Sequence, residues 1–146
     1  RATSTVRPPD SAGGSHLRIS LPSRPVADQP HAEEFSTRVL GFRTKHDIPV
    51  GEFRWLTVVS ADEPDGAELL LEPNEHPAAK QYQAALHADG IPVTSFEVDD
   101  VAATHRRLAD AGVTFTAAPT DMGDAIIAVF DDTCGNLIQI YEASHE

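Results

Sequence analysis

Apolar residues recur along this sequence with two spacings, which together predict an alternation of strands and helices. Leu17, Ile19 and Leu21 alternate with polar residues, a period typical of a β-strand. Pro22 and Pro25 suit an edge strand or a bend, because proline donates no hydrogen bond to a neighbouring strand. Short apolar runs separated by Pro- and Gly-containing turns predict further strands at residues 42–47, 53–60, 67–72, 93–98, 114–117, 125–131 and 137–141.

Three segments have the spacing and the end signals of helices. The first should begin at Asp28, whose carboxylate can cap the first turn, and end at Gly41. A second helix is expected over residues 77–88 and a third over residues 100–111, and each is followed closely by a glycine. The predicted order is therefore βαβββ, a linker helix, and βαβββ again.

The two βαβββ stretches repeat one pattern. Asp28 precedes Gly41 by thirteen residues, and Asp99 precedes Gly112 by the same distance (41 − 28 = 13 and 112 − 99 = 13). We expect two similar half-domains with a ligand site where they meet. The expected divisions, in chain order, are a disordered leader or expression remnant, the first module, the linker helix, the second module and a tail, at residues 1–16, 17–73, 74–91, 92–142 and 143–146.

Eight strands and two long helices within the repeats predict an α+β fold, in which two βαβββ modules form a cupped, mostly antiparallel sheet with helices on its outer face. Alternation then assigns the faces: Ile138 and Ile140 suit the helix-packed side, so their neighbours lie on the other side. The candidate ligand-binding residues on this other face are Trp55, Glu68, Leu70, Glu72, Ser95, Glu97, Gln139 and Tyr141. Alternation alone leaves open whether this face binds a ligand or is simply solvated.

Trp55 and its neighbour Arg54 point to opposite faces of their predicted strand, so one of the two must face the cup. Trp55 could stack on a planar ligand, or it could fill the core or a dimer interface. Arg54 would anchor an anion if it faced the cup, but a surface position is the simpler expectation.

Composition narrows the classes of partner. With 23 acidic and 11 basic residues, the chain has a formal net charge of −12, which argues against nucleic acid and anionic membranes as partners. That charge serves either solubility or the attraction of a cationic ligand. The sequence has no apolar run of the roughly 20 residues that span a bilayer and no secretory signal, so a cytoplasmic location is expected.

Cys134 is the single cysteine, so no disulfide can form within the chain. Asp131 and Asp132 stand close to it in a turn sequence. Neighbouring carboxylates raise the pKa of a thiol, and we therefore expect a turn residue rather than a nucleophile.

Three segments in this paired βαβββ order resemble the vicinal oxygen chelate superfamily: residues 39–42 (VLGF), 96–101 (FEVDDV) and 130–137 (FDDTCGNL). That superfamily includes glyoxalase I, bleomycin-resistance proteins, fosfomycin-resistance transferases and extradiol dioxygenases. The resemblance covers roughly residues 17–142 and specifies the fold better than the activity. Ser36 departs from the pattern, since an aromatic residue usually occupies that position, and this puts the packing of the first helix in doubt.

In the metal-dependent members of this superfamily, four strands each supply one metal ligand. The resemblance places these ligands at Leu21, Glu68, Val93 and Gln139, of which only Glu68 is a strong donor. A catalytic divalent ion generally needs about three protein donors. The histidines offer no substitute, because they are expected on helices and loops or before the first strand. We therefore expect no metal and no other cofactor.

The leading hypothesis is a metal-independent small-molecule-binding protein of the bleomycin-resistance type, with an antibiotic or another cationic or planar compound held between the halves. The resemblance also implies a homodimer. The alternative is a glyoxalase-like lyase or isomerase that uses a divalent metal with Glu68 and atypical ligands. A hard-cation site or an acid–base pair among Glu68, Glu72 and Glu97 also stays open, as does a vestigial cup that serves as an interaction module.

Overall fold

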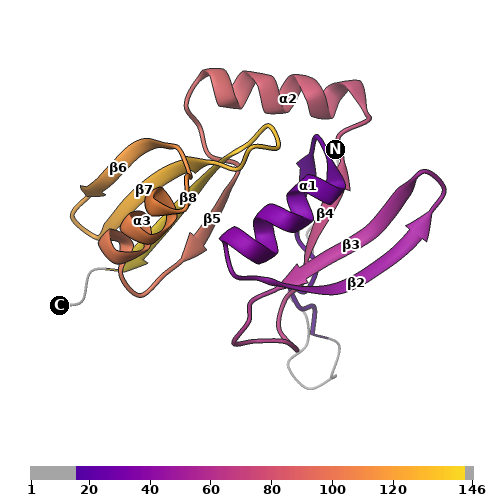
Figure 1. Ribbon diagram of the computed structural model, residues 1–146, viewed down its shortest axis with the longest axis horizontal. Helices are drawn as coiled ribbons and strands as arrows, with labels where there is room; N and C mark the ends of the chain where they lie inside the picture. The colour runs from indigo at the N-terminus through magenta and orange to yellow at the C-terminus, as the bar shows by residue number, and fades with distance from the viewer. Residues whose placement is uncertain (1–15, 144–146) are drawn as a thin grey trace, which may run out of the picture.

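The computed structural model describes residues 16–143, which form two modules joined by a helix (Figure 1). The first module contains β1 (Ser23–Val26), α1 (Gln29–Glu34), the π-helical turn η1 (Phe35–Val39), β2 (Arg43–Val50), β3 (Phe53–Val59) and β4 (Leu69–Pro73). The joining helix is α2 (Pro77–Ala88), and the second module contains β5 (Thr94–Glu97), α3 (Val101–Asp110), β6 (Phe115–Asp121), β7 (Ala125–Asp131) and β8 (Leu137–Ala143). Nearly all of the predicted leader and tail lies outside the described residues.

Each module builds one open four-stranded sheet, with strand orders β1-β4-β3-β2 and β5-β8-β7-β6. In each sheet one pair is parallel, β1 with β4 and β5 with β8, and the other pairs are antiparallel. The predicted α+β class is confirmed. The identical strand orders mean that the repeat in the sequence is also a repeat in the structure.

The predicted strand over residues 17–21 is wrong, because β1 begins only at Ser23. Leu17 and Ile19 are 101% and 91% exposed, so their alternation with polar residues has no core to pack against. Val26, in contrast, is fully buried. The expectation that the prolines place this strand at a sheet edge is confirmed, since β1 is the outermost strand of its sheet.

The two module helices begin and end with matching devices. Asp28 and Asp100 each accept a hydrogen bond from the backbone N–H three residues further on, at 2.9 Å in both modules. Each helix is followed by a glycine with positive φ, +86° at Gly41 and +95° at Gly112, a conformation that residues with a β-carbon rarely adopt. These devices fix the same βα geometry twice.

The segment between the capping aspartate and the glycine is one residue longer in the first module than in the second. From the capping Asp100 the second glycine is twelve residues away (112 − 100 = 12), against thirteen in the first module (41 − 28 = 13). The equal spacing counted from Asp99 therefore does not join equivalent residues. The first helix takes up its extra residue in η1, where the N–H of Leu40 donates to the carbonyl of Phe35 at 3.1 Å, across five residues.

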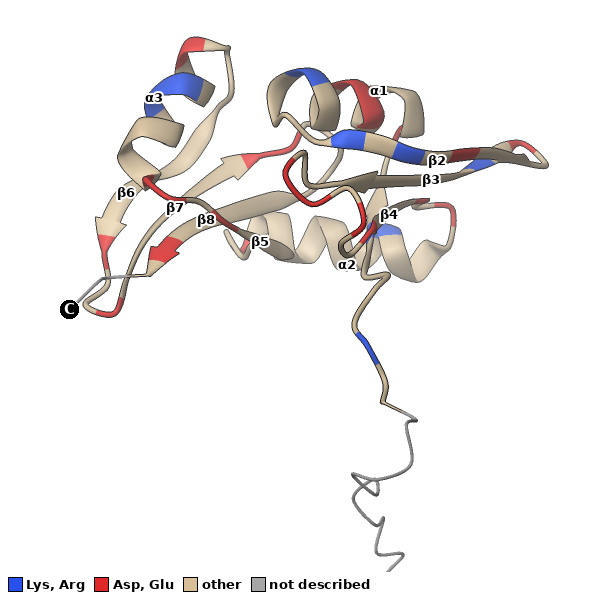
Figure 2. Cartoon of the chain, turned by 90° about the horizontal axis from the view of Figure 1, so that it is seen from below, with Lys and Arg blue, Asp and Glu red and all other residues tan. Residues whose placement is uncertain are grey.

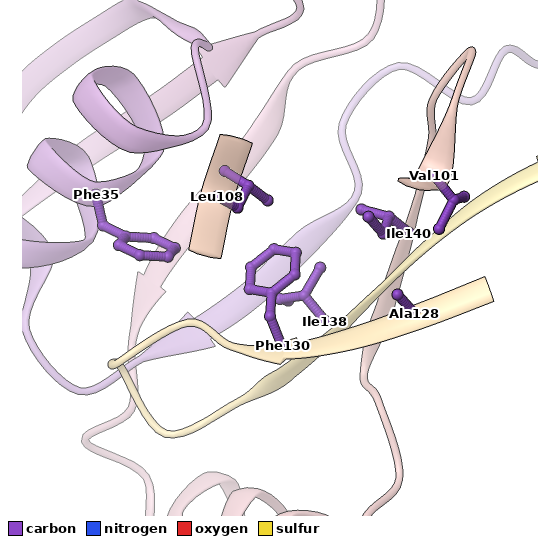
Figure 3. Close-up of a cluster of buried hydrophobic side chains, with 7 residues drawn as sticks. All are labelled: Phe35, Val101, Leu108, Ala128, Phe130, Ile138 and Ile140. Carbon is purple, nitrogen blue, oxygen red and sulfur yellow. The ribbon is translucent and has the colours of Figure 1, made fainter. Parts of the chain in front are cut away.

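Each module completes the hydrophobic core of the other. In the larger cluster, Val101 and Leu108 of α3 pack on β7 and β8, and Phe35 enters from the first module (Figure 3). The ring centroids of Phe35 and Phe130 are 6.3 Å apart. The smaller cluster lies between α1 and the first sheet, and it includes Cys134 from the second module. The interior is therefore shared rather than divided between two independent cores.

Helix α2, predicted over the same residues, is fastened to both modules by the buried side chain of Gln83. Its Nε2 donates to the carbonyl oxygens of Pro25 at 2.9 Å and Cys134 at 3.2 Å. It also donates to Oδ1 of Asn136 at 3.1 Å. A β-carbon at Gly135 would lie 3.0 Å from this nitrogen, so glycine permits the close approach. The linker thus holds the two modules in one relative position.

Charged residues are spread over both modules, and basic segments lie on β2 and α3 (Figure 2). Arg54 lies on the helix side of β3, where it donates to Asp47 at 2.7 and 2.8 Å and to Glu33 of α1 at 2.7 Å. These ion pairs raise the pKa of Arg54 and lower the pKa of Asp47. Arg54 therefore helps to hold α1 on the sheet and does not face the predicted cup. Among the described residues, no helix is long and apolar enough to cross a membrane.

Candidate functional site

The face of the first sheet that points away from α1, which we call the first helix-free face, carries a cluster of polar side chains. Leu56 and Leu71 pack under α1, so the residues that alternate with them point the other way. Thr57 and Leu70, which are partners in the β3–β4 register, belong to this other face. Glu68 precedes β4 with the same parity, as the sequence predicted.

Glu68 is held by two neighbouring side chains on this face. Oγ1 of Thr57 donates to Oε1 of Glu68 at 2.8 Å, and Nε2 of His46 lies 3.5 Å from the same oxygen. The backbone N–H of His46 in turn donates to Oγ1 of Thr57 at 3.1 Å. Thr57 is fully buried, whereas the side chains of Glu68 and His46 are 23% and 45% exposed. This arrangement leaves a carboxylate and an imidazole within reach of a ligand.

The expectation that no histidine lies on the predicted sheet face is wrong for His46. The residue lies in β2 opposite Thr57. A register shift between Thr44 and His46 breaks the alternation, because Thr44 pairs with Val58 while His46 pairs with the adjacent Thr57. Strict alternation from Thr44 would put His46 on the helix side. Only the bulge turns His46 toward Glu68, and the sequence has no clear signal for that bulge.

A cavity of about 440 Å³ lies where the two modules meet next to Glu68. Its other wall comes from β5 of the second module and contributes Ser95. Apolar residues such as Phe42 and Phe96, whose ring centroids are 5.0 Å apart, also line it. The structure thus brings together two of the predicted residues, one from each half of the repeat.

The predicted residues of the second module form a second group on the helix-free face of the second sheet. Nε2 of Gln139 donates to Oγ of Ser95 at 3.1 Å. Glu97 and Tyr141 are register partners on β5 and β8, one step further along the same two strands. Ile138, between these positions, is buried in the core as predicted. This face therefore carries an uncharged pair, Gln139 and Ser95, next to the ionisable Glu97 and Tyr141.

The remaining three predicted residues lie further along the first helix-free face. Trp55, Leu70 and Glu72 line a hollow of about 310 Å³ together with Phe53. Trp55 is 39% exposed, so its ring is open to a planar ligand or to another protein surface. Leu70 is buried and forms the floor of the hollow. The eight predicted residues thus occupy two sheet faces, which meet at the cavity between Glu68 and Ser95.

The residues at the four positions of the superfamily's metal site do not fit a divalent ion. Val93 lines the same cavity as Glu68, and Leu21 lies beside Glu68, because the N–H of Glu68 donates to the carbonyl of Ser20 at 2.8 Å. Neither hydrocarbon side chain can coordinate a metal, and the amide of Gln139 donates to Ser95. Within residues 16–143, no three His, Cys, Asp or Glu side chains converge as metal ligands. His46 raises the count of strong donors near Glu68 to two, fewer than the roughly three that such a site needs.

Cys134 lies in the turn between β7 and β8, as its sequence neighbours suggested, and its side chain is buried. Burial, reinforced by the charge of Asp132, raises the pKa of the Cys134 thiol to about 12. The thiolate is therefore scarce at neutral pH, and the residue is not a nucleophile.

Comparison with known proteins agrees with this geometry. In sequence, the chain is 56% identical over 126 residues to the uncharacterized protein YurT of Bacillus subtilis (strain 168), covering 86% of this chain and 99% of that protein. In structure, it is similar to UcmS2, with a TM-score of 0.75, 33% identity, and coverage of 87% of this chain and 98% of that one. It is also similar to TnmS3, an antibiotic binding protein from Streptomyces sp. CB03234, with a TM-score of 0.71, 27% identity, and coverage of 89% and 98%.

A family model matches almost the whole of the described chain. The match extends over residues 16–140 and is to the Glyoxalase/Bleomycin resistance protein/Dioxygenase superfamily. The paired βαβββ modules agree with this match. The chain belongs to the Glyoxalase/Bleomycin resistance protein/Dioxygenase superfamily, which confirms the resemblance to the vicinal oxygen chelate fold.

Proposed function

We propose that this protein binds a planar or cationic small molecule without a metal, at the cavity between Glu68 and Ser95. The observation that carries the proposal is the partly exposed Glu68 carboxylate, oriented by Thr57 and placed at an intermodule cavity of about 440 Å³. That volume lies within the range of roughly 300–1,000 Å³ usual for small-molecule sites, and a mostly apolar wall with a few polar groups is also usual. The antibiotic-binding TnmS3, which has the same fold, supports the same class of function.

The charge of the site favours a cation. The carboxylate of Glu68 carries the negative charge at the cavity, Ser95 is neutral, and the whole chain has a net charge of −12. A planar cation would pair with Glu68 and cover the aromatic edge formed by Phe42 and Phe96. An anion would face the carboxylate without a compensating basic side chain from the cavity wall.

Proflavine, a planar cation, tests this proposal directly. Proflavine at a free concentration one hundred times its Kd should stabilise the protein by about 2.7 kcal/mol, and a thermal-shift titration would detect this. Glu68→Gln should weaken the binding about tenfold or more, whereas Glu75→Gln, an equal charge change at an exposed residue before α2, should leave it unchanged. The planar anion 9-anthracenecarboxylate should bind weakly or not at all. Equal affinities of wild type and Glu68→Gln for proflavine would sink the proposal.

A homodimer is part of the same proposal. Within one chain the first helix-free face leaves large apolar side chains uncovered: Val50 is 58% exposed and Ile48 is 52% exposed, next to Trp55. A second copy would cover this surface and close the open side of the ligand site. Sedimentation of the wild type should then give twice the 15.7 kDa chain mass. Val50→Asp should give a monomer, and a wild-type monomer at micromolar concentration would contradict this part of the proposal.

A second candidate function rests on His46. Its imidazole lies 3.5 Å from Glu68, so the pair could supply two atypical ligands of a divalent metal in a glyoxalase-like lyase or isomerase. Metal analysis separates this reading from simple binding. A stoichiometric zinc, nickel or iron ion, lost together with an activity in both Glu68→Gln and His46→Gln, would replace the binding proposal. Purified protein that contains no metal and binds proflavine would support the first candidate.

The cytoplasm stays our proposed location.

A further inference from the structure

A larger cavity, of about 630 Å³, opens on the helix side of the junction and shares no lining residue with the cavity at Glu68. Four parts of the chain form it: α1 with η1, the end of α2, the turn after α3, and the turn between β7 and β8. None of these segments contributes a residue to the cavity of the proposed function. The size is again that of a small-molecule site.

A chain of hydrogen bonds crosses the rim of this helix-side cavity. Nε2 of His31, from α1, lies 2.7 Å from Oγ1 of Thr133. The N–H of Thr133 donates to Oδ1 of Asp131 at 2.8 Å, and Oδ2 of Asp131 is 2.9 Å from Nε2 of His87, near the end of α2. Both modules and the linker helix thus contribute polar groups to one rim.

The positions of the protons on this rim follow from the hydrogen-bond partners. Oγ1 of Thr133 donates its one proton to the carbonyl of Asp132 at 2.6 Å, so Nε2 of His31 must donate to Thr133. Nε2 of His87 donates to the carboxylate of Asp131. The rim therefore presents two imidazole rings and a carboxylate, and no Lys or Arg lines the cavity.

The wall beneath this rim is apolar. Phe35 and Val39 of η1 form one side, and Val113 in the turn after α3 forms the other. Phe35 is 8% exposed, because its ring also packs against Phe130 in the core. A ligand that fits must combine an apolar body with a group that donates hydrogen bonds or carries positive charge.

Two uncommon backbone features line this cavity. Thr133 has φ +62°, which is unfavourable for a β-branched residue, and it is the one non-glycine residue with positive φ in the described chain. The π-helical turn η1 supplies Phe35 and Val39, whereas the corresponding α3 reaches its glycine without such a turn. Strained and π-helical segments concentrate at functional sites.

We propose that the helix-side cavity is a second ligand site, which takes a small organic cation with an apolar body such as an arylalkylamine. The ammonium group pairs with the carboxylate of Asp131 on the rim, and the apolar body packs between η1 and Val113. This site is separate from the one at Glu68 and does not depend on the proposed function.

Phenethylamine, with one ammonium group and one phenyl ring, is the probe that tests this site. In a titration followed by amide NMR at millimolar concentration, we expect saturable shifts at Thr133, Val113 and His87. The neutral analogue 2-phenylethanol should shift these amides much less. Shifts at Glu68 and Ser95 would report binding at the other cavity, so the two proposals fail or succeed separately.

Two variants complete the test. Asp131→Asn keeps an acceptor for the N–H of Thr133 but loses the charge, and it should weaken phenethylamine binding about tenfold. His31→Gln, a change at an exposed residue, keeps a hydrogen-bonding side chain for Thr133 but loses the imidazole ring at the rim, and it should weaken binding several-fold even if Asp131→Asn fails to fold. Glu75→Gln, a charge-matched control, should bind as the wild type does. Absence of saturable shifts in the wild type, or equal binding by His31→Gln and wild type, would overturn the proposal.

Discussion

The two modules have the same strand order, the same aspartate caps and the same glycine stops, yet their helix-free faces differ in chemistry. The first face gathers ionisable groups, since His46 and Glu68 meet there. The second pairs neutral groups, Gln139 with Ser95. A few positions therefore suffice to fix the backbone of a βαβββ module, and the outward-facing residues of its sheet are free to differ.

The modules also differ in what each takes from the other. The second module's core receives the aromatic ring of Phe35, whereas the first module's core receives the smaller side chain of Cys134. Neither core is complete alone, so the modules should unfold together. Substitutions at the shared contacts should change the stability of both modules, whereas substitutions outside these contacts should affect only one.

The largest expected effect comes from the shared aromatic contact. Phe130 is fully buried and contacts Phe35 across the module boundary, so Phe130→Ala should lower the free energy of unfolding by about 4 kcal/mol. Phe53→Ala, at a residue 37% exposed, should cost less than about 1 kcal/mol and serves as the control. Urea unfolding, followed by amide signals from each module, would measure both. Two separate transitions, one for each module, would contradict the shared core.

The next effect comes from the buried pair of Arg24 and Asp132 at the junction. Nε of Arg24 lies 3.5 Å from Oδ2 of Asp132, and two of the guanidinium nitrogens, Nε and Nη1, have no hydrogen-bond partner. Burial lowers the pKa of Arg24, and the nearby carboxylate offsets this only in part. Asp132 in contrast accepts hydrogen bonds from Cys134 and Asn136.

Removing the two partners should therefore have unequal costs. Asp132→Ala leaves a buried cation and two backbone donors unsatisfied, and it should cost about 3 kcal/mol. Arg24→Met leaves Asp132 with its hydrogen bonds, and it should cost about 1 kcal/mol or less. Denaturant unfolding of both variants checks the order. A larger loss for Arg24→Met would mean that the guanidinium, and not the turn, holds the modules together.

A gain in stability is expected from Thr133→Gly. Relief of the strain at positive φ should raise the free energy of unfolding by about 1–3 kcal/mol. The greater freedom of glycine in the unfolded chain should lower it by about 0.5–1 kcal/mol. A net gain of about 1 kcal/mol should raise the Tm by roughly 2–4 °C. Differential scanning calorimetry would measure it, with Thr114→Gly, in the turn after α3, as a control that should lower the Tm. A lower Tm for Thr133→Gly would show that its hydroxyl contacts outweigh the strain.

The smallest effect concerns Asp47 and should stay within the first module. The hydrogen bond from Arg54 lowers the pKa of Asp47, so this contact adds stability above the unfolded carboxyl pKa of about 4. The added stability is lost as the pH falls through the lower folded pKa. Asp47→Asn should therefore be less stable than the wild type at pH 7, and the difference should vanish in acid, once the pH has fallen below the folded pKa. An unchanged difference at both pH values would contradict the assignment.

The sequence predicted most of the backbone because its signals are local. Residues 77–88 and 125–131 were predicted with the bounds that the structure has, since caps, glycines and alternation act within a few residues. The predicted strand over residues 17–21 failed for the opposite reason. Alternation of apolar side chains produces a strand only where a core is present to cover them, and Leu17 and Ile19 have none.

The candidate site was only partly predictable. Alternation put Glu68 and Ser95 on helix-free faces, but it could not show that the two residues line one cavity. It also missed His46, because a β-bulge reversed the alternation in β2. The histidines of the helix-side cavity, His31 and His87, are far apart in sequence. Both contact the turn between β7 and β8, and they do so only because the two modules pack together.

By itself, then, the sequence determined the duplicated βαβββ order, the superfamily, and the hydrocarbon side chains at Leu21 and Val93, which cannot bind a metal, since each depends on local pattern or on residue chemistry. The tertiary structure alone decided which polar groups share a cavity. Such juxtapositions depend on how the two modules pack, through Phe35 in one core, Cys134 in the other and Gln83 at the linker. These contacts join residues about 50 to 100 positions apart, beyond the reach of any local periodicity.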